Sequence, residues 1–173
     1  EIYSTTFITF IIILPIWIIF IEKQITKMII VREIYAKEVE LCFELDANSI
    51  GLWTKKQWKN EFNKERTKVF ALLLSNKIIG VCVIQVVVDE AQLNYLSINQ
   101  KFRRKGYGSY LMRYLIKKCE ILNLKRLSLE VSEINLVAEK FYNYFNFLTV
   151  GKRINYYRNG SNAVLKEKKL IKK

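Results

Sequence analysis

The sequence predicts a single α/β domain with a mixed sheet, preceded by an apolar segment. From residue 28 onward, short apolar runs of the strand type alternate with segments of helical periodicity. A chain of 173 residues has the length of one ordinary domain, and a hydrophobic content of 51% is enough to bury a core. No internal repeat and no low-complexity linker divides it, so one layered α/β unit is expected.

Periodicity, turn residues and cap residues locate the individual elements. The residues from Thr54 to Gln57 match a capping box, which opens a helix with Trp58 and Phe62 on its apolar side. Ser75 and Asn76 separate two apolar runs closely enough to predict a β-hairpin. In chain order, strands are expected over 28–31, 69–74, 78–88, 92–98, 126–131, 147–150 and 163–166, and helices over 33–46, from Thr54 onward, over 109–122 and over 136–144.

Residues 1–27 differ from the rest of the chain. No charged residue occurs between Ile2 and Ile21, and the apolar run from Phe7 approaches the ~20 residues that a membrane-spanning helix needs. The cations that follow would keep the remainder of the chain in the cytoplasm. Two other interpretations remain open: an appended or mis-started segment, because Met28 begins a clean strand, and a helix packed on the domain. We expect a boundary here, with the domain over 28–173.

The composition limits the chemistry that the chain can perform. There is no histidine, which excludes Ser-His-Asp and Cys-His catalysis, His-ligated zinc and a histidine base. The cysteines Cys42, Cys82 and Cys119 match no metal or redox spacing, and they are expected to be buried, reduced thiols of an intracellular protein. No metal site is expected. Proton transfer must therefore use carboxylate, tyrosine, lysine, cysteine or water.

The chain is strongly basic. Its 29 Lys and Arg against 16 Asp and Glu give a formal net charge of +13. This balance favours polyanionic partners such as nucleic acid, anionic lipid or a phosphate-bearing cofactor, although a lysine-rich coding bias would produce it too. The final stretch, 165–173, is expected to be a solvated tail.

A basic glycine loop lies between a predicted strand and a predicted amphipathic helix. Residues 103–108 read Arg-Arg-Lys-Gly-Tyr-Gly in a chain with only 6 glycines. Such a loop turns free backbone N–H groups and the positive end of the helix toward an anion, and glycine lets the backbone approach a phosphate. The spacing matches neither a P-loop nor a dinucleotide fingerprint. A basic turn without a ligand remains the alternative for this motif taken singly.

The loop and its flanks resemble the GCN-five-related N-acetyltransferases (GNAT). Arg-x-x-Gly-x-Gly is similar to the coenzyme A pyrophosphate loop of that family, and the resemblance covers about residues 28–165. The segments 83–112 and 127–147, together with Asn155-Tyr156-Tyr157, look like the RimI-type subgroup, which acetylates the N-terminal alanine of a ribosomal protein. The resemblance implies the GNAT fold, with a mixed, mostly antiparallel sheet flanked by helices, and acetyl-coenzyme A as co-substrate.

Carried over residue by residue, the resemblance also implies a site. Glu130 would be the general base and Tyr142 the general acid, while Tyr156 and Tyr157 would border the peptide groove. Asn135 would bond the coenzyme arm. The remaining cofactor-binding residues would be Leu96, Ser97 and Ile98 beside the acetyl and pantetheine groups, and Arg104, Lys105, Gly106, Tyr107, Gly108 and Ser109 at the pyrophosphate.

Each of these residues also has a plainer interpretation. Glu130 alternates with apolar neighbours in its strand and could face solvent. Tyr142 lies in an aromatic run where core packing is the commoner role, and Asn135 could be only a helix N-cap. Tyr156 and Tyr157 could be packed or turn residues.

The chain departs from the family at several positions. Arg103 replaces a usual glutamine, Asn99-Gln100 replaces Asp-Pro, and Asn146 stands where glycine is usual. These changes are expected to alter loop geometry more than chemistry. Leu52 takes the place of a proline, and Asn162 sits where an acidic residue is common.

We therefore expect a cytoplasmic enzyme that transfers acetyl from acetyl-coenzyme A to a protein N-terminus, the N-terminal alanine of a small-subunit ribosomal protein. A carboxylate and a tyrosine are sufficient for this reaction, because the α-amino group has a pKa near 8 and the leaving thiol one near 8.5. Association with the ribosome and membrane contact through 1–27 are open possibilities, and no specific nucleic acid is expected. The alternatives are acetylation of a lysine side chain or a small amine, and a non-catalytic membrane-tethered or RNA-binding module.

Overall fold

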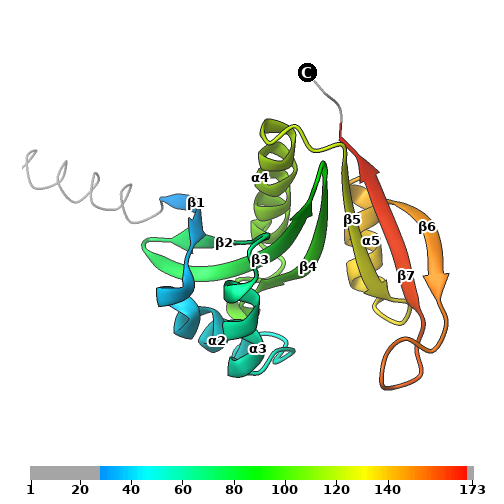
Figure 1. Ribbon diagram of the computed structural model, residues 1–173. Coiled ribbons are helices and arrows are strands. Elements are labelled where there is room, and N and C mark those ends of the chain that lie inside the picture. Colours follow the sequence, from blue (N-terminus) through cyan, green and yellow to red (C-terminus); the bar gives the residue numbers. More distant parts are fainter. Residues whose placement is uncertain (1–27, 171–173) are drawn as a thin grey trace, which may run out of the picture.

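The computed structural model describes residues 28–170, so the predictions made for residues 1–27 lie outside the described part of the chain (Figure 1). The strands are β1 (Ile29–Ile34), β2 (Thr67–Leu74), β3 (Lys77–Val87), β4 (Glu90–Ile98), β5 (Arg126–Ser132), β6 (Leu148–Arg153) and β7 (Ala163–Lys169). The helices are α2 (Val39–Ala47), α3 (Lys55–Asn63), α4 (Tyr107–Ile121) and α5 (Leu136–Tyr144), with 3-10 turns η1 (Ala36–Glu38) and η2 (Gln100–Phe102).

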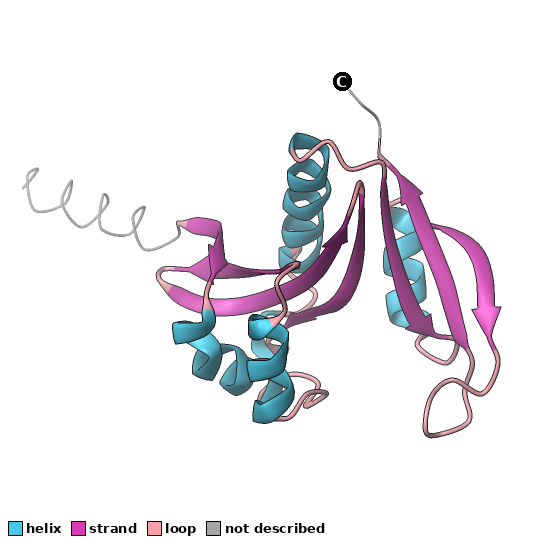
Figure 2. Ribbon diagram, viewed as in Figure 1, coloured by secondary structure: helices cyan, strands magenta, loops and turns pink. Residues whose placement is uncertain are grey.

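The strands form one seven-stranded sheet in the order β1-β2-β3-β4-β5-β7-β6. Every neighbouring pair is antiparallel except β4 and β5, which run parallel and are connected through α4. Figure 2 shows the helices on both sides of this sheet. The predicted mixed α/β class is confirmed.

Two apolar clusters lie on the opposite faces of the sheet. Leu111, Met112 and Leu115 of α4 pack on one face, together with the inner side of α5. Cys42 of α2 and Trp58 of α3 pack on the other face, beneath the first four strands. The alternation of side chains along the central strands supplies both clusters at once.

The parallel pairing between β4 and β5 is short, and the two strands separate beyond it (Figure 1). Their register runs only from Glu90 opposite Arg126 to Leu93 opposite Leu129. Directly after Leu93, the pairing of β4 with β3 skips Asn94, which is a β-bulge. A bulge bends its strand and increases the local twist. The last residues of β4 are thereby turned away from β5, and their edge on that side has no strand partner among residues 28–170.

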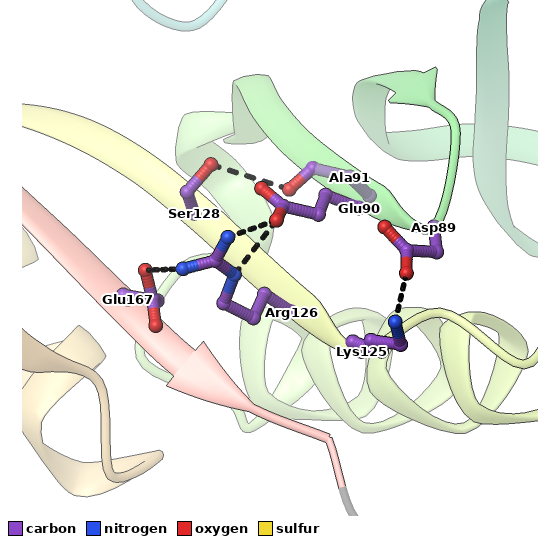
Figure 3. Close-up of polar contacts among 7 residues, drawn as sticks. All are labelled: Asp89, Glu90, Ala91, Lys125, Arg126, Ser128 and Glu167. Atoms are coloured by element: carbon purple, nitrogen blue, oxygen red, sulfur yellow. Dashed lines mark hydrogen bonds and ion pairs between the residues drawn. The ribbon is translucent and has the colours of Figure 1, made fainter.

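Ion pairs join β4 and β5 at the other, closed end of this junction. Figure 3 shows the Arg126 guanidinium between two carboxylates, bonded through Nε to Oε1 of Glu90 at 2.9 Å and paired through Nη1 with Oε2 of Glu167 at 3.4 Å. Beside it, Lys125 Nζ lies 2.5 Å from Asp89 Oδ2. The two halves of the sheet are therefore fastened at one end and separated at the other.

Most element boundaries differ from the sequence prediction by one to three residues, and three of the differences bear on the argument. The strand β1 continues to Ile34, which is buried opposite Val69, so the helix predicted from residue 33 begins later. The helix α4 begins at Tyr107, before the predicted start. Residues 165–169 belong to β7 and are not a solvated tail: Lys166 is only 1% exposed and bonds Asn143 Oδ1 at 2.8 Å.

Candidate functional site

The end of β4 lies at the open side of the junction. Leu96, Ser97 and Ile98 all come after the bulge, beyond the last pair that β4 makes with β5. The Ser97 hydroxyl is buried and has no hydrogen-bond partner within the described residues. Gly80 of β3 lies directly opposite Ile98, and a Cβ at this glycine would fall within 3.3 Å of the Ser97 carbonyl oxygen and would overlap the Ile98 side chain. The absence of a side chain at Gly80 therefore lets the end of β4 pack closely on β3.

The basic glycine loop connects this strand end to α4. Arg104 and Gly106 both adopt left-handed backbone conformations, with φ of 59° and 84°, and Gly106 is the N-cap of the helix. The first backbone bond of α4 runs from the N–H of Tyr110 to the Gly106 carbonyl. The N–H groups of Tyr107, Gly108 and Ser109 consequently have no partner inside the helix, as expected for its first turn.

The cations of the loop are exposed and available to an anion. Arg103, Arg104 and Lys105 form no ion pair with any described residue. Arg103 instead donates from Nε to the Ile98 carbonyl at 2.9 Å, which ties the loop to the end of β4. The Lys105 ammonium donates to the carbonyl of Lys101 at 3.1 Å. Arg103, one of the departures from the family, thus has a structural role.

Glycine at position 108 is not required by the packing of the protein. A Cβ there would lie 3.7 Å from both Ile98 and Phe141, an ordinary van der Waals distance, and the residue has a helical backbone. The same distances show that the first turn of α4 lies between the end of β4 and helix α5. A missing side chain at this point leaves the exposed N–H groups accessible to a ligand.

Glu130 does not simply face solvent. It lies on β5 just beyond the last pair with β4, and its side chain is only 16% exposed. Its Oε1 atom is 3.0 Å from Nη2 of Arg153 on β6. As a hydrogen-bond acceptor and as a charge, the Glu130 carboxylate raises the pKa of Tyr156; burial raises the pKa of Tyr157, and Glu130 adds to that effect. The structure therefore gathers Glu130, Arg153 and the two tyrosines.

Tyr142 reaches the same region from α5. Its ring packs edge-on against Phe141 and Phe147, with centroids 5.5 and 5.8 Å away. Burial strongly raises the pKa of Tyr142, and the neighbouring Cys82 and Tyr157 raise it further. The phenol is thus protonated throughout the physiological range, and it interacts electrostatically with Tyr157, as Glu130 does.

Asn135 is a helix N-cap, as the plainer interpretation held. Its Oδ1 accepts a hydrogen bond from the N–H of Ala138 at 3.1 Å at the start of α5. A role toward the coenzyme stays a prediction.

The loop between β6 and β7 is anchored to the end of β5. Ser161 Oγ lies 3.0 Å from Ser132 Oγ, and the Asn162 side chain donates to Glu133 Oε2 at 3.0 Å. The Oδ1 of Asn162 also accepts from the N–H of Asn155 at 2.9 Å. Asn162 is therefore a structural connection, and it holds the tyrosine pair of this loop beside Glu130.

A second loop, between α2 and α3, is anchored by a residue that the sequence analysis missed. Asp46 is fully buried, and its carboxylate accepts from the Tyr95 hydroxyl at 2.7 Å, from Trp58 Nε1 at 3.1 Å, and from the N–H groups of Trp53 at 2.8 Å and Leu52 at 3.1 Å. Tyr95 belongs to β4, so the loop is fixed relative to the strand that ends in the site. No local signal marked Asp46, because its partners lie up to 49 residues away.

The remaining departures from the family are accommodated in turns. Asn146 adopts a left-handed conformation with φ of 59°, which asparagine tolerates better than most residues. Asn99 accepts from the N–H of Lys101 at 3.1 Å and caps η2, and Gln100 donates to the Ser49 carbonyl at 3.1 Å.

The three cysteines lie within residues 28–170, the described part of the chain. Cys42, Cys82 and Cys119 are free and buried, as predicted, and burial raises the pKa of each thiol, to about 12 for Cys42 and Cys119. In this part of the chain, no group of three or more His, Cys, Asp or Glu side chains is arranged to hold a metal ion. None of its helices is both long and apolar enough to cross a membrane.

Comparisons with known proteins agree with this fold and identify the family. The ribosomal protein bS18-alanine N-acetyltransferase of Haemophilus influenzae is 32% identical over 131 residues, which are 75% of this chain and 88% of that protein. The crystal structure of the ribosomal-protein-S18-alanine N-acetyltransferase from Escherichia coli shares the fold, with a TM-score of 0.78, 24% identity and coverage of 83% of this chain and 94% of that one. An N-acetyltransferase of Thermoplasma acidophilum solved in complex with coenzyme A also shares it, with a TM-score of 0.64, 18% identity and coverage of 82% and 99%. Residues 31–147, more than half of the chain, match the model of the acetyltransferase (GNAT) family. The chain therefore belongs to the acetyltransferase (GNAT) family and is an N-acetyltransferase that uses acetyl-coenzyme A.

Proposed function

We propose that the enzyme acetylates the α-amino group of a protein, and that its substrate is the N-terminal alanine of a small-subunit ribosomal protein. The observation that carries this proposal is the position of Glu130, a carboxylate only 16% exposed on β5 just beyond the last pair with β4, at the open end of the junction from which the glycine loop leads into α4. Both Glu130 and Tyr142 of α5 interact electrostatically with Tyr157. The name of the Haemophilus influenzae relative supports the choice of substrate.

Acetyl-coenzyme A would bind along the glycine loop and the end of β4. The free N–H groups of Tyr107, Gly108 and Ser109 and the positive end of α4 suit the pyrophosphate, and the side chains of Arg104 and Lys105 add charge. The unpaired edge of Leu96, Ser97 and Ile98 would offer backbone hydrogen bonds to the acetyl and pantetheine groups. Asn135 would bond the coenzyme arm. The fit rests on the unpaired N–H groups of the first helical turn, the open space above Gly106 and the missing side chain at Gly108.

The proposed chemistry needs one base and one acid. Glu130, directly or through one water, takes the proton that leaves the substrate amine, whose nitrogen then bonds to the thioester carbon. The carbon–sulfur bond breaks, and Tyr142 gives its proton to the departing thiolate. Burial raises the pKa of Tyr142 and would also raise that of a thiol beside it, so the two groups stay matched for proton transfer. Backbone N–H groups near Ile98 would stabilise the developing oxyanion.

Two variants test these roles. Glu130→Gln should abolish most of the turnover at neutral pH, because the amide cannot accept the proton. Tyr142→Phe should lower kcat about 100-fold while leaving the KM for acetyl-coenzyme A within about twofold, since the ring packing is retained. Equal activity of either variant and the wild type would refute the role assigned to that residue.

The substrate claim is tested separately. Mass spectrometry of ribosomal proteins from cells lacking the gene should reveal one small-subunit protein with an unacetylated N-terminal alanine. A panel of peptides beginning with alanine, compared with lysine side chains and small amines, separates this claim from the alternative substrates. Unchanged N-terminal acetylation of every ribosomal protein would overturn it.

The proposal places the domain in the cytoplasm, where ribosomal proteins are made, and it allows association with the ribosome. In this proposal the chain consists of an apolar segment over 1–27, which would contact a membrane, and a catalytic domain over 28–173. A fusion of 1–27 to a reporter, followed by membrane fractionation, tests that contact.

A further inference from the structure

Arg153 reaches Glu130 from two strands away. Glu130 lies on β5 and Arg153 on β6, and β7 runs between them. Adjacent strands are about 4.8 Å apart, so the guanidinium must cross roughly 10 Å to reach the carboxylate. The register shows why it can cross: Ala163 of β7 is paired with Ser132 on one side and with Arg153 on the other, and its small side chain leaves space above the strand.

The environment of Glu130 makes this contact its main charge interaction. Its partner on β7 is the apolar Leu165, and its nearest neighbours on the same face of β5 are the neutral Ser128 and Ser132. Arg126, one position further along that face, pairs with Glu90 and Glu167 instead. Glu167 of β7, opposite Ser128, lies on the same face and is paired with Arg126. The other titratable groups beside Glu130 are Tyr156 and Tyr157 of the β6–β7 loop. No helix contributes a charged group to this carboxylate within residues 28–170, where Arg153 is the only cation paired with it.

Arg153 is itself held in place on one side and free on the other. Its guanidinium carbon lies 5.3 Å from the centre of the Tyr156 ring, which is a cation–π distance. Its side chain is nevertheless 54% exposed, whereas that of Glu130 is 16% exposed. An amine that approaches Glu130 from solvent must therefore approach the Arg153 charge as well.

We propose that Arg153 is a positioning residue for Glu130, which fixes the carboxylate and, by its charge, disfavours the protonated form of an amine bound there. This inference rests on the proposed role of Glu130 as the base. An ammonium ion and the guanidinium would compete for one carboxylate, and they repel each other. A neutral amine suffers no such repulsion, so the bound substrate loses its proton at a lower pH than it would beside an unpaired carboxylate.

The sign of the expected effect follows from this repulsion. Without Arg153, the bound amine keeps its proton to higher pH, so the acid limb of the kcat–pH profile moves upward. For a partly exposed pair a few ångströms apart, the shift should be about 0.5–1 pH unit. On the acid side of the profile this corresponds to a three- to tenfold loss of kcat. The KM for the amine should fall or stay constant, because the ammonium form now binds to a free carboxylate.

The experiment measures kcat and KM from pH 6 to pH 9.5 with acetyl-coenzyme A and the best amine of the peptide and amine panel. Arg153→Gln should show the upward shift and should approach wild-type kcat at high pH, whereas Arg153→Lys should restore most of the wild-type profile. Lys152→Gln is the matched control: it removes a neighbouring cation that pairs with Glu133 at 3.7 Å and not with Glu130. A uniform loss of kcat at every pH, or a raised KM, would indicate only a structural role and would overturn the inference.

A second measurement does not depend on turnover. The carbon-13 chemical shift of the Glu130 carboxylate at neutral pH should change in Arg153→Gln, which removes its ion-pair partner, and should keep its wild-type value in Lys152→Gln. Glu130→Gln separates the inference from the proposed function: full activity of that variant would remove the base assignment. If Glu130→Gln is inactive and the kcat–pH profile of Arg153→Gln is the same as that of the wild type, the role assigned to Arg153 is refuted and that of Glu130 stands.

Discussion

The buried carboxylate of Asp46 offers a sharp test of how the α2–α3 loop is held. It accepts hydrogen bonds from the Tyr95 hydroxyl, from Trp58 Nε1 and from two backbone N–H groups of the loop, at Leu52 and Trp53. In Asp46→Asn, an NH2 group replaces one oxygen. This group donates hydrogen bonds, so it cannot accept the bonds that the surrounding donors make to the carboxylate. The shape of the side chain is retained, so the change is almost purely one of charge and hydrogen bonding.

The magnitude follows from the bonds that are lost. Each oxygen of Asp46 accepts two of the four bonds, so the amide leaves about two donors unsatisfied in a buried site. Hydrogen bonds to a charged group contribute about 1.5–3 kcal/mol each, and removal of the buried charge offsets part of the loss. We expect a decrease of about 3 kcal/mol in the free energy of unfolding, or a fall in Tm of roughly 10 °C.

The effect should depend on pH. Burial alone raises the pKa of Asp46, but the hydrogen bonds from Tyr95, Trp53, Leu52 and Trp58 outweigh it and hold the pKa below its ordinary value. A carboxyl group whose pKa is lower in the folded state contributes stability above its unfolded pKa of about 4, and this contribution is lost as the pH falls through the folded value. The difference between the wild type and Asp46→Asn should therefore shrink below pH 4.

Urea unfolding at pH 7 and pH 3 measures both quantities. Glu44→Gln, an exposed change on the same helix, is the control and should alter stability by less than about 0.5 kcal/mol. A loss below 1 kcal/mol in Asp46→Asn at pH 7, or an equal loss at both pH values, would refute the reasoning.

Three further substitutions test the site and the sheet. Gly108→Ala should stabilise the free enzyme by up to about 1 kcal/mol, because alanine is the better helix former and its Cβ fits, but should raise the KM for acetyl-coenzyme A at least tenfold in steady-state assays. Lys166→Met should cost about 1–3 kcal/mol in chemical unfolding, because it leaves Asn143 and Thr149 without the ammonium that bonds them in a buried site; an unchanged midpoint would contradict this. Gly80→Ala should cost about 1–3 kcal/mol and should also weaken acetyl-coenzyme A binding in calorimetry, since its Cβ displaces Ile98.

The sequence was sufficient for the class of fold and for most elements, because those depend on local periodicity. The hairpin turn at Ser75-Asn76 and the capping box at Thr54 are formed as predicted, with the Thr54 hydroxyl accepting from the N–H of Gln57 at 3.3 Å. Local sequence patterns failed to predict the burial of a residue whose partners are distant in the sequence. The lysine-rich end of the chain has no apolar pattern, yet Lys166 is buried because α5 and β6 provide its polar partners.

The candidate site could be predicted only in part, for the same reason. The glycine loop is contiguous, so its residues and their helix were identifiable together. Period-2 alternation left Glu130 open to a solvent-facing interpretation, because alternation cannot show that β6 and its loop supply Arg153 and Tyr156 across an intervening strand. Asp46 likewise acquires its importance from Tyr95, 49 residues away.

The short β4–β5 ladder has a consequence for how the molecule fluctuates. Only four residue pairs, from Glu90–Arg126 to Leu93–Leu129, join β1–β4 to β5–β7 across the sheet. Backbone amides just past Leu93 should therefore exchange with deuterium faster than those inside the ladder. A molecule of acetyl-coenzyme A lodged between the two halves would slow that exchange and, at 100 times its Kd, would add about 2.7 kcal/mol to the stability of the whole. Bound acetyl-coenzyme A would then connect β1–β4 to β5–β7 at the end of the sheet where the two groups of strands do not pair.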